Sequence, residues 1–219
     1  LSANTQYDLR ITSRNGDGII SGILDGINRY TLIEAPLGAT YEGVTTNSIT
    51  IHSSNEINNL VTGESGILFD RTSPLMLSGS DYVIPTSGWI KTNTWQHNNL
   101  SPNTRYTFKI TTRNGTSEIG GTADGLTKYT LAATPSAPTV NGSYDATLGY
   151  NVTIKINRNG NPSGTNYAVT TDEGNSWLDR DTKATTTEVK WNNNLTGWMF
   201  KNLLNNTSYN LRIKAKNGD

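Results

Sequence analysis

The sequence predicts an all-β protein built from antiparallel β-sandwiches in tandem, and three observations carry that prediction. Apolar and polar residues alternate in short segments, and Gly, Asn and Pro recur between these segments. No ten-residue segment sustains the i, i+3, i+4, i+7 apolar spacing of a helix. Alternation with period two indicates strands with one buried face, and frequent turn residues without helical periodicity are typical of sandwiches.

The clearest predicted strand contains Tyr106, Phe108 and Ile110, which alternate with polar residues and are followed by an Asn-Gly turn signal. Two other segments keep the same phase, one with Tyr7, Leu9 and Ile11 and one with Tyr209, Leu211 and Ile213. Asn-Gly supplies the backbone angles that tight turns require. Further strands are predicted at residues 48–52, 66–70, 151–156 and 167–171.

The chain repeats itself with a period of about 100 residues. Residues 1–36 align without a gap with residues 100–135, and 18 of the 36 positions are identical. A looser third copy lies 103 residues after the second and includes Asn206, Tyr209 and Asn217-Gly218. A period of this length corresponds to one small domain per repeat and is far longer than a solenoid unit.

Composition narrows the classes of function. Asn, Thr, Ser and Gly together make up 99 of 219 residues, Cys is absent, and Lys plus Arg balance Asp plus Glu at 18 each. The charge balance lacks the basic footprint of a nucleic-acid-binding protein, and no apolar run is long enough for a membrane-spanning helix. Absence of Cys excludes thiol catalysis, thiolate-bound zinc and disulfides.

Motif searches yield no catalytic or metal site. Residues 170–177 fit an Asp-box, which is a structural turn around Asp172, and residues 15–20 resemble half of an EF-hand loop without its terminal Glu. His52 and His97 have no partner motif, so both are predicted to be solvated strand or loop residues. The sequence predicts no enzyme activity, no cofactor and no calcium site.

The segment Leu100-Ser-Pro-Asn-Thr-Arg-Tyr106, followed by alternating apolar residues, resembles strand F of a fibronectin type III module. The stretches 88–95 and 159–167 resemble modules of bacterial extracellular and cell-surface proteins. The resemblance implies tandem immunoglobulin-like (fibronectin type III-like) antiparallel β-sandwiches. It also implies tyrosine corners at Tyr7, Tyr106 and Tyr209, in which a buried Tyr hydroxyl bonds to backbone a few residues upstream. We expect Tyr106 and Tyr209 to be buried.

Alignment of the repeat with the strand order of a seven-strand module divides the chain into three predicted segments. Residues 1–36 supply the C-terminal strands, F and G, of a first module, residues 37–135 form a complete second module, and residues 136–219 form a third module lacking its last strand. Two strands cannot bury a core alone. We therefore expect the ends to be completed by neighbouring modules of the same chain or by identical subunits placed head to tail.

Five Trp residues divide into two groups. Trp95 and Trp198 both lie 11 residues before a corner Tyr, which predicts core packing. Trp89, Trp177 and Trp191 are candidates for exposed stacking on sugar rings. The predicted function is a non-catalytic spacer, adhesion or filament module of an extracellular, cell-surface protein. The alternative is an accessory region of a secreted polysaccharide-active enzyme that binds polysaccharide.

Overall fold

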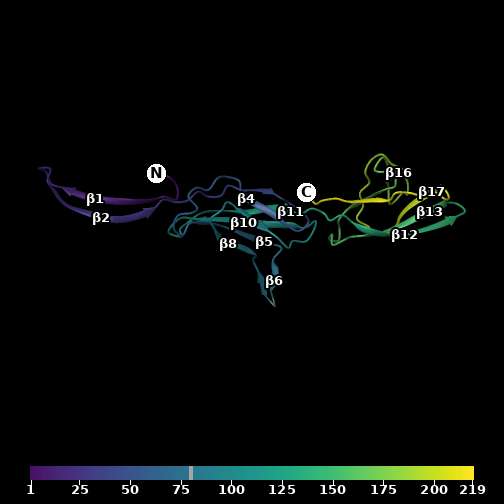
Figure 1. Cartoon of the computed structure of the whole chain (residues 1–219), viewed down its shortest axis with the longest axis horizontal. Helices are drawn as coiled ribbons and strands as arrows, with labels where there is room; N and C mark the ends of the chain where they lie inside the picture. The colour runs from purple at the N-terminus through teal and green to yellow at the C-terminus, as the bar shows by residue number, and fades with distance from the viewer. Residues whose placement is uncertain (79–80) are drawn as a thin grey trace. The chain divides into compact units, whose positions relative to one another are not determined.

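The computed structural model describes residues 1–78 and 81–219 of the chain, and its secondary structure there consists of strands and turns without a helix. The strand ladders are antiparallel (Figure 1). The predicted all-β sandwich fold is therefore confirmed. Among the described residues, none belongs to a helix long and apolar enough to cross a membrane. Residues 79–80, inside the predicted second module, lie outside the described part.

The chain divides into two compact units. The first comprises Leu1–Gly43, Ile49–His97 and Tyr106–Lys128, and the second comprises Val44–Ser48, Asn98–Arg105 and Tyr129–Asp219. The division into segments 1–36, 37–135 and 136–219 stays a prediction.

The first unit begins with a long hairpin. Strands β1 (Gln6–Arg14) and β2 (Ile20–Tyr30) form a two-stranded sheet with bulges after Leu9 and Ser13. Leu9 and Ile11 are 48% and 57% exposed, whereas Phe108 and Ile110, which are 99 residues further along, are completely buried. The same alternating pattern therefore forms a strand in both copies but a core in only one.

The remaining strands of the first unit form a sandwich of two sheets (Figure 1). The three-stranded sheet has the order β3 (Ala39–Glu42), β4 (Ile49–Ser53), β9 (Thr94–His97). The four-stranded sheet has the order β11 (Ile119–Tyr129), β10 (Arg105–Arg113), β5 (Gly66–Ser73), β8 (Thr86–Ile90). A small hairpin, β6 (Met76–Ser78) with β7 (Asp81–Val83), extends from β5.

Aromatic side chains join the two sheets of this sandwich. The Trp95 ring stacks on Phe69 with centroids 6.3 Å apart and meets Phe108 edge-on at 6.5 Å. Ile49 and Ile51 from one sheet, and Phe69 and Phe108 from the other, are fully buried. The predicted strands at 48–52 and 66–70 correspond to β4 and β5, and the predicted packing role of Trp95 is confirmed.

The second unit contains a three-stranded sheet and two short strand pairs. The sheet has the order β12 (Ser136–Asp145), β13 (Gly149–Asn157), β17 (Trp198–Leu203). β14 (Tyr167–Thr170) pairs with β18 (Arg212–Ala215), and β15 (Trp177–Leu178) pairs with β16 (Thr185–Thr186). Its buried core consists of Ile154, Ile156, Tyr167, Val169, Leu178, Trp198 and Phe200. Trp198 is fully buried, as its spacing predicted.

The third corner strand is shorter than its sequence pattern predicts. β18 begins only at Arg212, because its partner β14 ends at Thr170, the residue paired with Arg212, and the chain then enters the Asp172 turn. Tyr209 precedes the strand and is 37% exposed, whereas Tyr106 is 3% exposed. The predicted burial is therefore right for Tyr106 and wrong for Tyr209.

Candidate functional site: repeated module joints and a polar network

Two of the three corner tyrosines, Tyr7 and Tyr106, lie at the start of β1 and β10, and Tyr209 lies three residues before β18. The Tyr7 hydroxyl accepts a hydrogen bond from the Ser2 N–H at 2.8 Å, and the Tyr209 hydroxyl accepts one from the Leu204 N–H at 2.9 Å. Both bonds reach back five residues, the geometry that a tyrosine corner requires. Tyr106 lies buried beneath the guanidinium of Arg71, 5.4 Å from its ring centroid.

The loop that each corner holds contains an Asn, and in the first unit this Asn is completely buried. Asn4 has a left-handed backbone with φ of 44°, a conformation that Asn tolerates better than most residues. Its side-chain amide donates to the Asn59 carbonyl at 2.7 Å, and its side-chain oxygen accepts from the Gly115 N–H at 2.9 Å. Asn59 returns a bond to the Ala3 carbonyl at 2.9 Å. This set of contacts, here called a joint, fastens the hairpin to the sandwich.

A second joint occurs in the second unit at the repeat-equivalent position. Asn103 has φ of 46° and is 8% exposed. Its amide donates to the Thr165 hydroxyl at 2.9 Å and to the Lys216 carbonyl at 3.3 Å. Asn4 and Asn103 also donate their backbone N–H to the equivalent carbonyls of Leu32 and Leu131, both at 3.0 Å. The same residue in the same backbone conformation therefore fastens two segments twice through its amide. The two joints differ at the side-chain oxygen, because Asn4 accepts from Gly115 whereas the buried Asn103 oxygen has no hydrogen-bond partner among the described residues.

A glycine facing a tyrosine ring completes each joint. A Cβ atom on Gly115 would lie 2.3 Å from Tyr30, and one on Gly218 would lie 2.3 Å from Tyr129. Real Cβ atoms essentially never approach other atoms so closely. Tyr30 and Tyr129 are 99 residues apart, as are Asn4 and Asn103, so the tyrosine and the joint Asn recur together at the repeat spacing, each time with a facing glycine.

The turns singled out in the sequence are stabilised by their own side chains. Asp172 accepts from the Ser176 hydroxyl at 2.5 Å and N–H at 2.9 Å, and from the Thr170 hydroxyl at 2.7 Å. The Ser176 and Thr170 bonds favour the carboxylate and lower the Asp172 pKa to about 2. Asn15 likewise accepts from the Asp17 and Ile19 N–H groups. These oxygens are used within the turns, and no group of three or more metal-ligating side chains occurs among the described residues.

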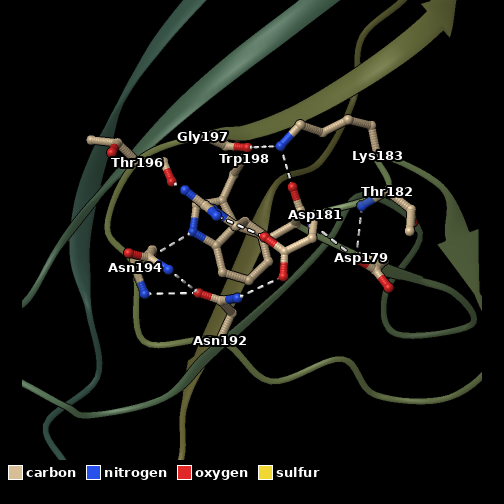
Figure 2. A network of polar contacts seen from close by, with 10 residues as sticks. Asp179, Asp181, Thr182, Lys183, Asn192, Asn194, Thr196, Gly197 and Trp198 are labelled. Atoms are coloured by element: carbon tan, nitrogen blue, oxygen red, sulfur yellow. Dashed lines mark hydrogen bonds and ion pairs between the residues drawn. The ribbon is translucent and has the colours of Figure 1, made fainter.

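A polar network surrounds the buried Trp198 in the second unit (Figure 2). The indole N–H donates to the Asn194 carbonyl at 2.8 Å, and Asn192 accepts from the Asn194 N–H at 2.8 Å. Lys183 donates to the Gly197 carbonyl, and burial lowers the Lys183 pKa. The network ties the long loop between β16 and β17 to the loop before it.

The acidic groups of this network have structural partners. Asp179 accepts from the N–H groups of Thr182 and Asp181, which lower the Asp179 pKa, and Asp181 pairs with Arg180 at 2.7 Å. Sequence reasoning missed this network. Its signal was the dense run of Asn and Asp on either side of β16, a composition that also fits an ordinary loop.

One of the two histidines differs from the prediction. His52 lies between Glu42, at 2.6 Å, and the Thr94 hydroxyl, at 2.8 Å. His97 is packed instead of solvated, because its ring stacks on Trp95 with centroids 4.6 Å apart. Burial, with a contribution from the positive charge of Arg71, lowers the His97 pKa to about 4.

The candidate sugar-stacking tryptophans are mostly covered. Trp177 is 3% exposed and belongs to the β15–β16 strand pair, so its ring is not available for stacking on a sugar. The Arg113 guanidinium lies over the Trp89 ring at 4.4 Å from its centroid. Trp191 is exposed, and the Lys216 ammonium lies 5.9 Å from its ring centroid.

No family model matches the chain, and no curated protein matches its sequence. Among solved structures, the chain is similar to a crystal structure of chicken CNTN1 FN1-FN3 domains. The match covers 99% of this chain and 72% of that chain, with 14% identity and a TM-score of 0.36.

Proposed function

We propose that the chain is a non-catalytic structural segment of an extracellular, cell-surface protein, where its modules act as spacers or as an adhesion scaffold. The observation that carries the proposal is the joint built twice, around Asn4 and around Asn103. A joint that buries an Asn side chain and bonds its amide to a second segment holds the two segments in one geometry. Loose linkers lack such contacts.

The polar groups of the chain support a structural role. Asp172 and Asp179 accept bonds from their own turns, and Lys183 binds two backbone carbonyls. A general acid or base must instead be free to contact a substrate at hydrogen-bond distance. The partners we propose are neighbouring modules of the same chain or identical subunits placed head to tail.

The test is removal of the joint in one unit. Asn103→Ala removes the side-chain donor to Thr165 and Lys216, and losing such buried bonds costs about 1–3 kcal/mol. Hydrogen exchange in peptides covering 161–167 and 214–218 should accelerate. Asn206→Ala is the matched control, because Asn206 is the exposed third copy of the same residue. Equal exchange in both variants would contradict the proposal.

The alternative function, polysaccharide binding, has its own readout. The full chain should not be retained on insoluble polysaccharides. Retention that disappears in Trp191→Ala would replace the spacer proposal with the carbohydrate-binding one, since Trp191 is an exposed ring.

A further inference from the structure

The loop around Asn206 is the third copy of the joint loop. Asn206 has φ of 49°, close to the 44° of Asn4 and the 46° of Asn103. Thr207 donates its hydroxyl to the Asn205 carbonyl at 3.0 Å, as Thr5 does to Ala3 at 2.9 Å and Thr104 does to Pro102 at 2.9 Å. The Tyr209 corner is closed as well. The loop is therefore folded for a joint, yet Asn206 is exposed.

The turn around Gly16 is equivalent to the other half of the joint, which in the first unit is the Asn114-Gly115 turn. In the joint of the first unit, Asn4 accepts from Gly115, which follows Asn114 in a turn. Asn114 accepts from the N–H groups of Thr116 and Glu118 at 3.1 and 2.9 Å, and Asn15 accepts from those of Asp17 and Ile19 at 3.1 and 2.9 Å. The two turns therefore have the same internal bonding. No other side chain or backbone lies within 4 Å of a Cβ position on Gly16.

We propose that these two halves meet between two copies of the chain, so that the Asn206 loop of one copy docks on the Asn15-Gly16 turn of a second copy. By equivalence with Asn4 and Gly115, the Asn206 side-chain oxygen accepts a hydrogen bond from the Gly16 N–H. This inference rests on the proposed structural function and names the contact through which head-to-tail stacking occurs.

Apolar surface lies beside both halves. A groove of about 380 Å³ next to Asn206 is lined by Tyr144, Tyr150, Leu203 and Tyr209 among others. At the turn, Ile19 is 64% exposed where the second copy of the repeat has Glu118. Burial of such side chains supplies association energy that one hydrogen bond in water does not.

The hairpin offers only part of a complete joint. Asn4 also donates to Asn59, in a loop of the sandwich, and the hairpin of a second copy has no such loop beside its turn. Small interfaces of this kind are weak. The contact should therefore be detectable at high concentration and by trapping.

The first experiment traps the contact. The chain contains no Cys, so Asn206→Cys and Gly16→Cys each introduce a single thiol. Mixed under mild oxidation, with one copy tagged to differ in mass, they should form the heterodimer at least tenfold faster than Asn206→Cys with Asn28→Cys. Asn28 is an exposed residue of the same hairpin away from the turn. Equal rates for the two mixtures would overturn the proposal.

The second experiment uses the unmodified contact. The Gly16 amide resonance should move with concentration of the full chain, the Gly115 amide should not, and Asn206→Ala should abolish most of the movement. A Gly16 shift that is independent of concentration, or unchanged in Asn206→Ala, would also overturn it. If both experiments fail while Asn103→Ala loosens its joint, the docking contact is wrong and the spacer function stands.

Discussion

Acid should weaken the sandwich of the first unit through one residue, His97. Its ring stacks on Trp95 at 4.6 Å and meets Phe108 edge-on at 6.4 Å, so protonation would place a charge among aromatic rings close to Arg71. The His97 pKa is lowered from 6.5 to about 4. Between these values the unfolded chain binds more protons than the folded chain, so stability falls as the pH falls through this window.

The size of the effect follows from the shift. A difference from 6.5 to about 4 corresponds to about 3.4 kcal/mol at 1.36 kcal/mol per pKa unit. The ring is only half-buried, and solvent screens part of the interaction. We therefore expect a loss of about 1.5 kcal/mol from this residue between pH 7 and pH 4.

Urea unfolding at a series of pH values measures this loss directly. His97→Phe keeps an aromatic ring against Trp95 and removes the titration. Between pH 7 and pH 4, the variant should therefore lose about 1.5 kcal/mol less unfolding free energy than the parent chain. His52→Gln, which removes the other histidine, is measured alongside it for comparison. The reasoning is refuted if His97→Phe and the parent chain have the same slope, or if His97 titrates near 6.5 by NMR.

Four further predictions concern the repeat and its turns. Phe108→Ala, in the core, should cost about 3–5 kcal/mol in urea unfolding, and its repeat equivalent Leu9→Ala less than about 1 kcal/mol, so equal losses would contradict the burial difference. Tyr106→Phe should cost about 1–3 kcal/mol and Tyr7→Phe less, since Tyr7 is partly exposed. Gly115→Ala should cost about 1–3 kcal/mol because its Cβ meets the Tyr30 ring, whereas Gly16→Ala should be close to neutral in dilute solution. Calcium or a chelator should leave the melting temperature unchanged, and a rise of several degrees with calcium would reveal a site that the turns at Asp17 and Asp172 do not explain.

The sequence predicted strands well because strand formation depends on local alternation. β4, β5, β13 and β14 each lie within a few residues of the predicted ranges. The length of β18 could not be predicted, because it depends on where its partner β14 ends. The burial of His97 could not be predicted either. His97 stacks on Trp95 within β9, but Phe108 of the facing sheet covers it, and the local residues do not specify that sheet. The network around Trp198 depends on loops whose path the local residues do not specify.

Comparison of the three copies of the joint loop shows that the local sequence determines the loop conformation, whereas a neighbouring segment determines whether the Asn side chain is buried. Asn4, Asn103 and Asn206 share a left-handed backbone, so the local residues and the corner tyrosine are sufficient to fold the loop. Their exposure differs, from completely buried Asn4 to exposed Asn206, so burial requires a second segment to arrive. An Asn side chain in water already has its hydrogen bonds, and moving it into a joint is favourable only when the incoming segment replaces them. The turn that follows Asn114 replaces one of these bonds through the Gly115 N–H. The joint of the first unit is therefore selective for partners that present a backbone donor without a side chain in the way, a condition that the Gly16 turn also meets.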